Sequence, residues 1–534
     1  MSDDIVNIEV DGKPVEARKG QMVMQVTDRI GAYIPRFCYH EKLSVAANCR
    51  MCLVEVEKAP KLVIGCATPA ADGMVVRTQN ERVKEAQRAV MEFLLINHPL
   101  DCPICDQAGE CRLQEYAVEY GSGVSRTVEP RLTSNKAIDI GEHILLDQER
   151  CIQCSRCIRF CDEVSKTGEL AFFKRGEKTV IGIYPGKRLD NLYSGNTADI
   201  CPVGALTVKE FRFQTRVWYL KNTPSICAGC ARGCNVMVAT GKQQTSMTTR
   251  GQIDDRIKRV VPRVNDAVNG FWICDPGRLS YKRLDAAPRL ARAHAPAGSE
   301  VEWDDGVRRA AEALKGARRI GVLVSPRLTS ETMFAWRELL ESLSGVTLGV
   351  RRVEEGEDDE LLIRRDKGAN SQGAAWIFSN DAGEQAVVDA AGRGELDAVL
   401  VLGDPLDPED SPRLPEAARS KVGSVIYVGA FVDAAAGSAT VALPAAAWSE
   451  EDGSIVNFEG HVQRVARAHM PRTEGRPGWR VALEIAAAAG LDAPTWTEAS
   501  EAFAALAATV EPFDGLTWDG LGLLGARGGA RATA

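Results

Sequence analysis

Cys151-Ile152-Gln153-Cys154-Ser155-Arg156-Cys157-Ile158-Arg159-Phe160-Cys161, followed after a longer gap by Cys201-Pro202, is the stretch that decides how this chain is organised. The run has the spacing C-x2-C-x2-C-x3-C, with which a short loop wraps a four-iron cluster. Two-cluster ferredoxins contain this run twice, and the fourth Cys of each run ligates the other cluster. Counting back from Cys201 by the same spacing reaches Asn191, Ser194 and Thr197, so the second run lacks its first three cysteines. The spacing therefore predicts one [4Fe–4S] cluster held by Cys151, Cys154, Cys157 and Cys201, and it leaves Cys161 without a cluster.

Length and composition limit the number of domains and the function classes that are possible for this chain. At 534 residues it is too long for a single core, so we expect several domains. A net charge of −8 gives no reason to expect nucleic-acid binding, which needs a basic face. No apolar run reaches the ~18 residues of a membrane helix, and residues 1–20 are too polar for a signal peptide. We expect a chain on the cytoplasmic side that reaches a membrane only through partner proteins.

Cysteine placement narrows the chemistry. All 16 cysteines lie between Cys38 and Cys274. In a cytoplasmic chain, C-x2-C pairs favour metal sites over disulfides. A zinc site with four thiolates is the alternative metal centre. Runs of three or four cysteines at short intervals suit cubane iron–sulfur clusters better.

The N-terminal region predicts a β-grasp [2Fe–2S] ferredoxin domain over residues 1–77. Residues 5–10 alternate apolar and polar, Asp11-Gly12 is a hairpin turn, and a helix is expected over 21–31. Strands at 53–56 and 62–64 fix a cysteine loop on the sheet. That loop contains Cys38-x10-Cys49-x2-Cys52-x13-Cys66, which is like the plant-type [2Fe–2S] pattern with a longer first gap.

Residues 78–120 predict a second cluster site at the end of a helix. Thr78 and Glu81 form a capping box at its start, and the helix must stop before Pro99. Its apolar stripe contains Val83, Ala86, Val90, Phe93 and Leu94. The sequence then reads His98-x3-Cys102-x2-Cys105-x5-Cys111. Three cysteines cannot complete a cubane, so we predict His98 as the fourth ligand of a [4Fe–4S] cluster. A neutral imidazole in place of a thiolate raises the cluster potential.

Residues 121–219 predict the one-cluster ferredoxin-like domain. A short helix at 113–120 and a linker precede a strand at 144–146, which leads into the Cys151 run. Helices are expected after each cysteine run, at 158–164 and 205–213, as in a pseudo-twofold ferredoxin.

Residues 220–285 predict a third [4Fe–4S] site. Cys227-x2-Cys230-x3-Cys234 is followed after 39 residues by Cys274. Strands are expected at 235–239 and 257–261. The first three cysteines have cubane spacing, and Cys274 is the candidate for the fourth ligand.

Residues 286–534 predict a parallel, doubly wound α/β domain. Helices at 306–314 and 329–343 alternate with strands at 320–324, 346–350, 399–402 and 425–428, and a helix is expected around Ala417. Neither G-x-G-x-x-G nor G-x4-G-K-[ST] occurs here, so no nucleotide site is predicted. Residues 525–534 are rich in Gly, Ala and Arg and predict a frayed tail.

The order of these motifs resembles one family, the large iron–sulfur subunits of respiratory complex I. The resemblance covers residues 1–285. More loosely, 439–463 is similar to molybdopterin oxidoreductases in Trp448, Asn457, Glu459, Gly460 and Gln463. The gap before Cys274 is longer than in the family. The C-terminal region is also short for a molybdopterin-type domain, so we expect a reduced domain.

The resemblance implies the function. The chain is expected to be a subunit of an NADH:quinone oxidoreductase that relays electrons from NADH and FMN on a partner towards quinone. It implies one [2Fe–2S] and two or three [4Fe–4S] clusters, no molybdenum, and no bond-making catalytic residue. The implied partners are an NADH/FMN-binding subunit and a ferredoxin-like subunit.

Other classes share parts of this pattern. An electron-transfer subunit of an NAD-linked hydrogenase has the N-terminal motifs but should lack the α/β half. A formate dehydrogenase chain would keep the cysteines of both ferredoxin runs. This chain has Asn191, Ser194 and Thr197 in place of three of them, which disfavours that class. An iron-only hydrogenase needs C-terminal cysteines, and a zinc scaffold would be colourless.

Overall fold

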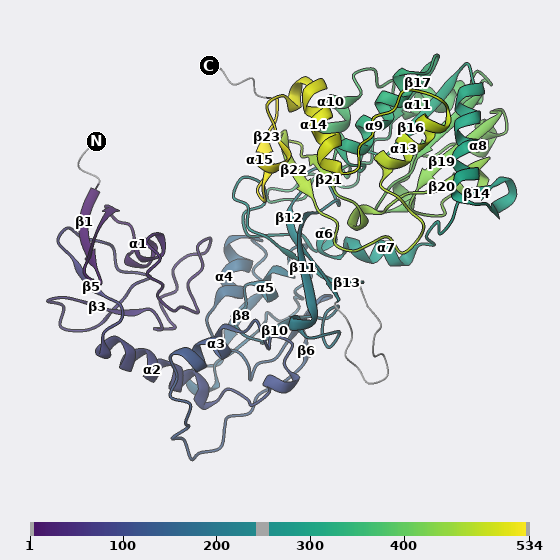
Figure 1. Cartoon of the computed structure of the whole chain (residues 1–534). Helices are drawn as coiled ribbons and strands as arrows, with labels where there is room; N and C mark the ends of the chain where they lie inside the picture. The colour runs from purple at the N-terminus through teal and green to yellow at the C-terminus, as the bar shows by residue number, and fades with distance from the viewer. Residues whose placement is uncertain (1–4, 242–255, 530–534) are drawn as a thin grey trace. The chain divides into compact units, whose positions relative to one another are not determined.

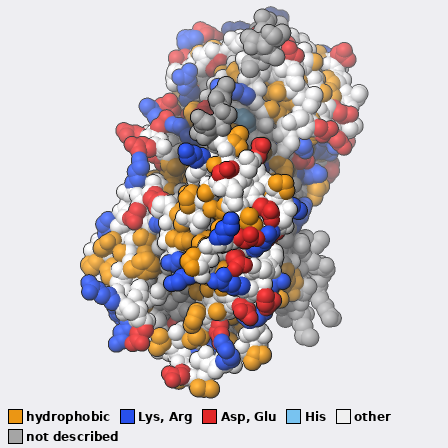
Figure 2. Space-filling view, turned by 90° about the vertical axis from the view of Figure 1, so that its left-hand side faces the viewer, with side chains coloured by type: hydrophobic (Ala, Val, Ile, Leu, Met, Phe, Trp, Pro, Cys, Tyr) orange, Lys and Arg blue, Asp and Glu red, His pale blue; other side chains and the backbone are white. Residues whose placement is uncertain are grey.

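The computed structural model describes residues 5–241 and 256–529. The chain divides into two compact units, Met1–Tyr219 and Leu220–Ala534, and each is described by itself. The finer division into five domains stays a prediction. On the face drawn in Figure 2, basic and acidic side chains are interspersed. Within the described ranges no helix combines the length and apolar character needed to cross a bilayer.

The first unit opens with a mixed five-stranded sheet in the order β2-β1-β5-β3-β4. Its strands are β1 Ile5–Val10, β2 Lys13–Arg18, β3 Leu53–Val56, β4 Val63–Ile64 and β5 Val75–Arg77, and helix α1 spans Val23–Arg29. β1 pairs antiparallel with β2 and parallel with β5. Ile8, Val23 and Val54 are among the buried side chains that form its core. The predicted ββα opening and both strands of the cysteine loop are confirmed.

Helix α2 spans Glu81–Ile96, and its predicted start at Thr78 is wrong. The N-cap is Asn80, whose side chain accepts a hydrogen bond from Val83 N at 3.0 Å. Thr78 instead bonds to the turn that follows strand β1, since its amide and its hydroxyl both donate to the Asp11 carboxylate. The predicted apolar stripe is also wrong at Phe93, whose side chain is 74% exposed.

The ferredoxin-like part follows the predicted strand and first helix. Its elements are α3 Arg112–Glu119, β6 Ile138–Asp139, β7 Ile144–Leu146, α4 Arg156–Glu163, β8 Leu170–Phe173, β9 Val180–Ile183, α5 Asn196–Asp199 and β10 Leu206–Val208. The helix predicted over 205–213 is wrong, because Leu206 lies opposite Leu146 in an antiparallel pair of strands and residues 209–213 form turns. The β-branched Thr207 and Val208 favour this strand.

The second unit starts with a three-stranded antiparallel sheet that belongs with the C-terminal α/β region. Its strands are β11 Leu220–Ile226, β12 Asn235–Gly241 and β13 Ile257–Pro262. Trp448 Nε1 donates to Ile226 O at 2.9 Å, and Asn235 Nδ2 donates to Gln463 Oε1 at 2.6 Å. Buried hydrogen bonds therefore join the Cys227 region to the segment 439–463, whose sequence is similar to molybdopterin oxidoreductases.

A seven-stranded sheet forms the centre of the second unit, in the order β15-β14-β20-β19-β18-β16-β17. The strands are β14 His294–Ala295, β15 Ser299–Glu300, β16 Ile320–Val324, β17 Val346–Val350, β18 Ala398–Leu402, β19 Ser424–Gly429 and β20 Val441–Pro444. The five strands from β17 to β20 are parallel, which confirms that prediction (Figure 1).

Helices cover both faces of this sheet. Val322 and Leu400 pack in one core with α8 Trp303–Gly316 and α9 Ser330–Glu341. Leu323 and Val401, the next residue along each strand, pack in another core with helix α11 Glu384–Gly392. The predicted helix around Ala417 is present as α12 Glu416–Arg419.

A small third sheet corrects the prediction of a frayed tail. Its strands are β21 Gly453–Val456, β22 His461–Val465 and β23 Ala526–Arg527. Ala526 pairs with Val462, so the first part of the predicted tail is ordered. Residues 530–534 lie outside the described residues.

Candidate iron–sulfur centres

The N-terminal cysteine loop arranges its four thiols as two pairs. Hydrogen bonds join Cys38 with Cys49 and Cys52 with Cys66. The Cys49 thiol lowers the pKa of Cys38, whereas the Cys66 thiol and burial raise the pKa of Cys52. Arg50 has a φ of 60°, a left-handed conformation that a non-glycine residue adopts only when its surroundings hold it. Two thiol pairs suit a binuclear centre in which each iron takes one pair.

The second predicted site brings its three cysteines together. Burial raises the pKa of Cys111 to about 11, and Cys105 and Cys102 are close enough to add to this. Cys105 is buried, Cys111 is half-buried and Cys102 is exposed. Gly204 packs against this site, because a Cβ there would lie 2.2 Å from Cys105 Sγ. Only glycine allows that approach.

His98 lies at the end of helix α2, two residues beyond Ile96. Burial lowers the pKa of its imidazole to about 4, and the positive charge of Arg150 adds to the effect. The ring is therefore neutral at pH 7, as a metal ligand must be. Arg150 also lies close to Cys105, and its guanidinium pairs with the Asp101 carboxylate at 2.9 Å. Ligation by His98 stays a prediction.

The third site is assembled at the start of α4. Burial and the neighbouring Cys201 thiol raise the pKa of Cys154 to about 11. Burial also raises the pKa of Cys157, and Cys154, Cys151 and Cys201 add to that shift, so all four predicted ligands are neighbours. Within the loop, Gln153 N donates to Cys151 Sγ at 3.4 Å, and Gln153 has a left-handed φ of 56°.

Cys201 is held by backbone donors. Burial raises the pKa of its thiol, and the amides of Val203, Leu206 and Ala205 oppose this by donating hydrogen bonds to the sulfur. Amide donors stabilise a thiolate, which is the form that ligates iron.

A carboxylate occupies the half of the ferredoxin-like unit whose cysteines are missing. Glu169 accepts hydrogen bonds from Asn191 Nδ2, at 3.0 Å, and from the hydroxyl of Thr167. Burial and Glu169 raise the pKa of the Cys161 thiol, which is hydrogen-bonded to this carboxylate. Thr197 Oγ1 donates to Ser194 O at 2.7 Å. Glu169 thus joins Cys161 and Asn191 by hydrogen bonds, and a separate hydrogen bond joins Thr197 to Ser194, at the positions that a second cluster would have linked.

The fourth site lies in the second unit and includes Cys274. Burial raises the pKa of Cys234, and Cys227, Cys230 and Cys274 add to the shift, so the long gap in sequence is closed in space. All four cysteines line one cavity. A Cβ at Gly277 would lie 3.1 Å from Cys274 Sγ and 3.2 Å from Cys227 Sγ. Cys274 also accepts a hydrogen bond from Gly277 N at 3.3 Å.

These donor sets fit clusters better than single ions. In the described part of the chain, no three His, Cys, Asp or Glu side chains converge as ligands of one metal ion. The thiols of a cluster are spread over two or four irons and need not meet at one point. Apart from the exposed Cys102, the thiols of the four sites are buried or half-buried, and amide donors and glycines lie against several of the sulfurs. These features are consistent with iron–sulfur clusters. Ligation by the individual residues stays a prediction.

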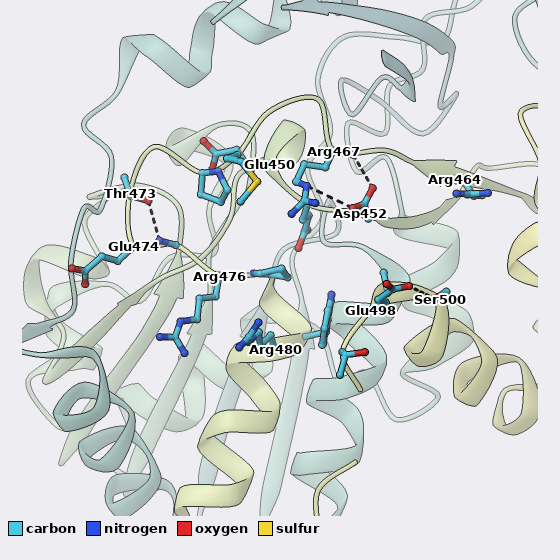
Figure 3. A pocket seen from close by; sticks show the side chains of 18 of the residues that line it. Glu450, Asp452, Arg464, Arg467, Thr473, Glu474, Arg476, Arg480, Glu498 and Ser500 are labelled. Carbon is cyan, nitrogen blue, oxygen red and sulfur yellow. Dashed lines mark hydrogen bonds and ion pairs between the residues drawn. The ribbon is translucent and has the colours of Figure 1, made fainter. Parts of the chain in front are cut away.

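A charged cavity of about 690 Å³ lies in the second unit, and no cysteine lines it. Figure 3 shows Arg467 facing Asp452, with an ion-pair distance of 3.8 Å, and Ser500 beside Glu498. Its basic side chains largely pair with acidic ones, so the cavity offers no net charge for a ligand of one sign. Glu451 lines it from a buried position.

Two buried carboxyl groups near this cavity predict a pH dependence. Burial raises the pKa of Glu331 to about 7 and that of Glu451 to about 8, from an ordinary 4.5. Both carboxyl groups are more easily protonated in the folded chain than in the unfolded chain. The stability that the protonated groups contribute to the folded chain is therefore fully present below about pH 4.5 and is lost as pH rises through about 7 to 8. Between about pH 4.5 and about pH 8 we expect the free energy of unfolding of this unit to fall by on the order of 3 to 5 kcal/mol per group.

Denaturant unfolding followed by the fluorescence of buried tryptophans such as Trp336 measures this slope. Glu451→Gln should flatten the upper part of the curve, whereas the exposed Glu474→Gln should not. Stability that increased between about pH 5 and about pH 8 would contradict the assignment.

Five families of known proteins match successive segments. A 2Fe-2S iron-sulfur cluster binding domain matches residues 3–81, and the NADH-ubiquinone oxidoreductase-G iron-sulfur binding region matches 87–126. The ferredoxin-like domain of NADH-quinone oxidoreductase subunit 3 matches 141–207. The molybdopterin oxidoreductase Fe4S4 domain matches 220–286, and molybdopterin oxidoreductase matches 366–488. The predicted [2Fe–2S] and [4Fe–4S] domain types are confirmed.

Curated relatives are similar to this chain over about two thirds of its length. The G subunit of NADH-quinone oxidoreductase from Rickettsia felis is 40% identical over 357 residues, 65% of this chain and 50% of the relative. This chain is homologous to the NADH-quinone oxidoreductase G subunit. The mitochondrial NADH dehydrogenase [ubiquinone] iron-sulfur protein 1 of Solanum tuberosum is 41% identical over 64% of this chain and 45% of its own length. The chain thus spans about half the length of the curated G subunits it matches.

Among solved structures, one chain of an NAD+-reducing [NiFe]-hydrogenase is similar, at 27% identity and a TM-score of 0.37. The similarity covers 40% of this G-subunit homologue and 91% of the hydrogenase chain.

Proposed function

We propose that this chain is the iron–sulfur electron-transfer subunit of an NADH-quinone oxidoreductase. It would relay electrons from NADH and FMN on a partner subunit towards quinone, on the cytoplasmic side of the membrane. When bound at the four sites, iron–sulfur clusters take up and release one electron at a time. The protein's own residues hold the thiolates, keep water out and set the local charge.

The spatial order of the sites in the first unit carries this proposal. The Cys38 loop contacts the Cys151 site, since Arg159 Nη2 donates to Cys38 O and also, at 3.3 Å, to Cys154 O. On its other side the Cys201 segment contacts the Cys102 site, where Cys111 Sγ lies 3.9 Å from Pro202 O. The three sites form a series in which the Cys151 site is central, although it comes last in sequence. Such a series suits a relay.

One end of the series reaches the surface. Cys102 is the one exposed cysteine among the described residues. The neighbouring Leu100 and Ile104 are 79% and 60% exposed. Exposed apolar side chains beside a redox site suit a docking surface. We assign this end to the ferredoxin-like partner, and the Cys38 end to the NADH/FMN-binding partner.

The α/β domain is assigned a structural role without molybdenum. No cysteine follows Cys274, and the family match over 366–488 does not by itself imply a bound cofactor. The fourth site, at Cys227–Cys274, belongs to this second unit.

EPR of the reduced, purified chain, beside iron and molybdenum counts, tests the proposal. We expect signals of one binuclear and up to three tetranuclear clusters, with no stoichiometric molybdenum. A count of only two tetranuclear clusters would contradict the assignment of a cluster to the Cys227–Cys274 site. Stoichiometric molybdenum, or a colourless protein without EPR signals, would refute the proposal.

A further inference from the structure

Two arginines on α4 join the Cys38 site to the Cys151 site. Arg159 donates to Cys38 O, Ser44 O and Cys154 O, and its Nε bonds Ser155 Oγ at 3.1 Å. Its guanidinium thus contacts the main chain of a ligand from each site. Arg159 is buried, with 8% of its surface exposed.

Arg156, one turn earlier, repeats the arrangement with the residues next to the ligands. It donates to Tyr39 O, beside Cys38, and at 3.1 Å to Ile200 O, beside Cys201. Its Nε is buried and has no hydrogen-bond partner within the described residues. Among the cysteines, Cys154 and Cys201 interact most strongly with this guanidinium, ahead of Cys38. Together with the hydrogen bond to Ile200 O, this places the Arg156 side chain next to the Cys151 site.

Two further contacts complete the interface between the loops. Asn48 Nδ2 donates to Gln153 O at 3.0 Å, and Ser44 N donates to the Glu163 carboxylate at 2.8 Å. The Glu163 carboxylate is held by Ser44 and brings a negative charge to the rim of this interface. The two arginines bring the buried positive charge.

The charge balance points to the clusters. Burying a guanidinium is costly unless an anion lies nearby. In the described ranges neither Arg156 nor Arg159 forms an ion pair with a carboxylate; their hydrogen bonds go to neutral oxygens. Clusters ligated by four thiolates are anionic and would supply the missing negative charge to both arginines.

We propose that Arg156 and Arg159 are positioning residues that hold the two sites together and raise the reduction potential of both clusters, with Arg156 Nε–H donating to a sulfur of the Cys151 site. This rests on the proposed function, because it requires a [2Fe–2S] cluster at one site and a [4Fe–4S] cluster at the other. A positive charge between them stabilises the reduced form of each, since reduction adds a negative charge.

EPR-monitored redox titration of the full-length, iron-loaded chain tests the proposal. In Arg159→Gln and Arg156→Gln we expect the reduction equilibria of both clusters to shift towards the oxidised form, by about tenfold, which is ~59 mV for one electron. Arg159→Lys and Arg156→Lys keep the charge, so they should recover most of the shift. The exposed Arg188→Gln is the matched control and should leave both potentials unchanged.

The outcomes separate this proposal from the proposed function. If the wild type lacks either signal, the proposed function fails first. If both signals are present and neither Gln variant moves both potentials, the arginine proposal is overturned. If a Gln variant loses its clusters, the Lys variants decide the question. Lys variants that retain both clusters with near wild-type potentials support the proposal. If both Lys variants also lose their clusters, the proposed role of the positive charge is overturned.

Discussion

Replacing Cys201 by Ser is expected to remove one tetranuclear cluster, whereas Cys161→Ser should leave every cluster in place. Cys201 lies among Cys151, Cys154 and Cys157, and three backbone amides donate to its sulfur. A serine hydroxyl in that position is a poor iron ligand at neutral pH, because its pKa is far higher than that of a thiol. Iron should fall by about one cubane, four irons, per chain.

Cys161 is the matched control because its thiol is buried and it belongs to the same cysteine run as three of the predicted ligands. The thiol bonds the Glu169 carboxylate, and a serine hydroxyl can donate to the same acceptor. Iron content and the EPR spectrum check both variants. Loss of a cluster in Cys161→Ser together with a full complement in Cys201→Ser would reverse the assignment of the two cysteines.

Replacement of His98 should have the second largest effect on the clusters. His98→Ala is expected to lose the cluster of the Cys102 site, because three thiolates do not complete the ligand set. His98→Cys should retain the cluster and lower its potential by on the order of 100 mV, since a charged thiolate replaces a neutral imidazole. Redox titration followed by EPR measures both changes.

Another half-buried histidine in the same unit provides the control. His143 bonds Glu210 at 2.8 Å and lies outside the predicted ligand sets, so His143→Ala should keep every signal. If His98→Ala kept an unchanged signal and potential at the Cys102 site, a residue other than His98 would have to be the fourth ligand.

Much of the fold could be predicted from local pattern. β3, β7, β16 and β17 match their predicted bounds because short apolar, β-branched runs bounded by turns specify strands directly. The parallel sheet followed from the alternation of these strands with helices. Its two separate cores follow in turn, since neighbouring residues of a strand face opposite sides.

The errors arose where distant residues compete with local pattern. Thr78 has the right spacing to Glu81 for a capping box, but Asp11 engages its amide and hydroxyl, and Asn80 caps instead. Leu206–Val208 follow a cysteine run, as a ferredoxin helix does, yet β7 offers them a strand partner. Neither Asp11 nor β7 could be identified as a partner from sequence spacing.

The candidate sites show the same division. Cysteine spacing predicted each of the four sets, including Cys274 across its long gap. Arg156 and Arg159 were missed, although both lie inside the decisive run, because their significance comes from contacts more than a hundred residues away, at Tyr39 and Cys38. The position of both arginines between cysteines of one run was the feature of the sequence that could have indicated their role.

The Glu169 network has a consequence for how the chain matures. Glu169 is joined to Asn191 and to Thr167 by hydrogen bonds that need no iron. We therefore expect this half of the ferredoxin-like unit to fold before a cluster is inserted, and the loop at Cys151–Cys157 to receive its cluster next to structure that is already formed.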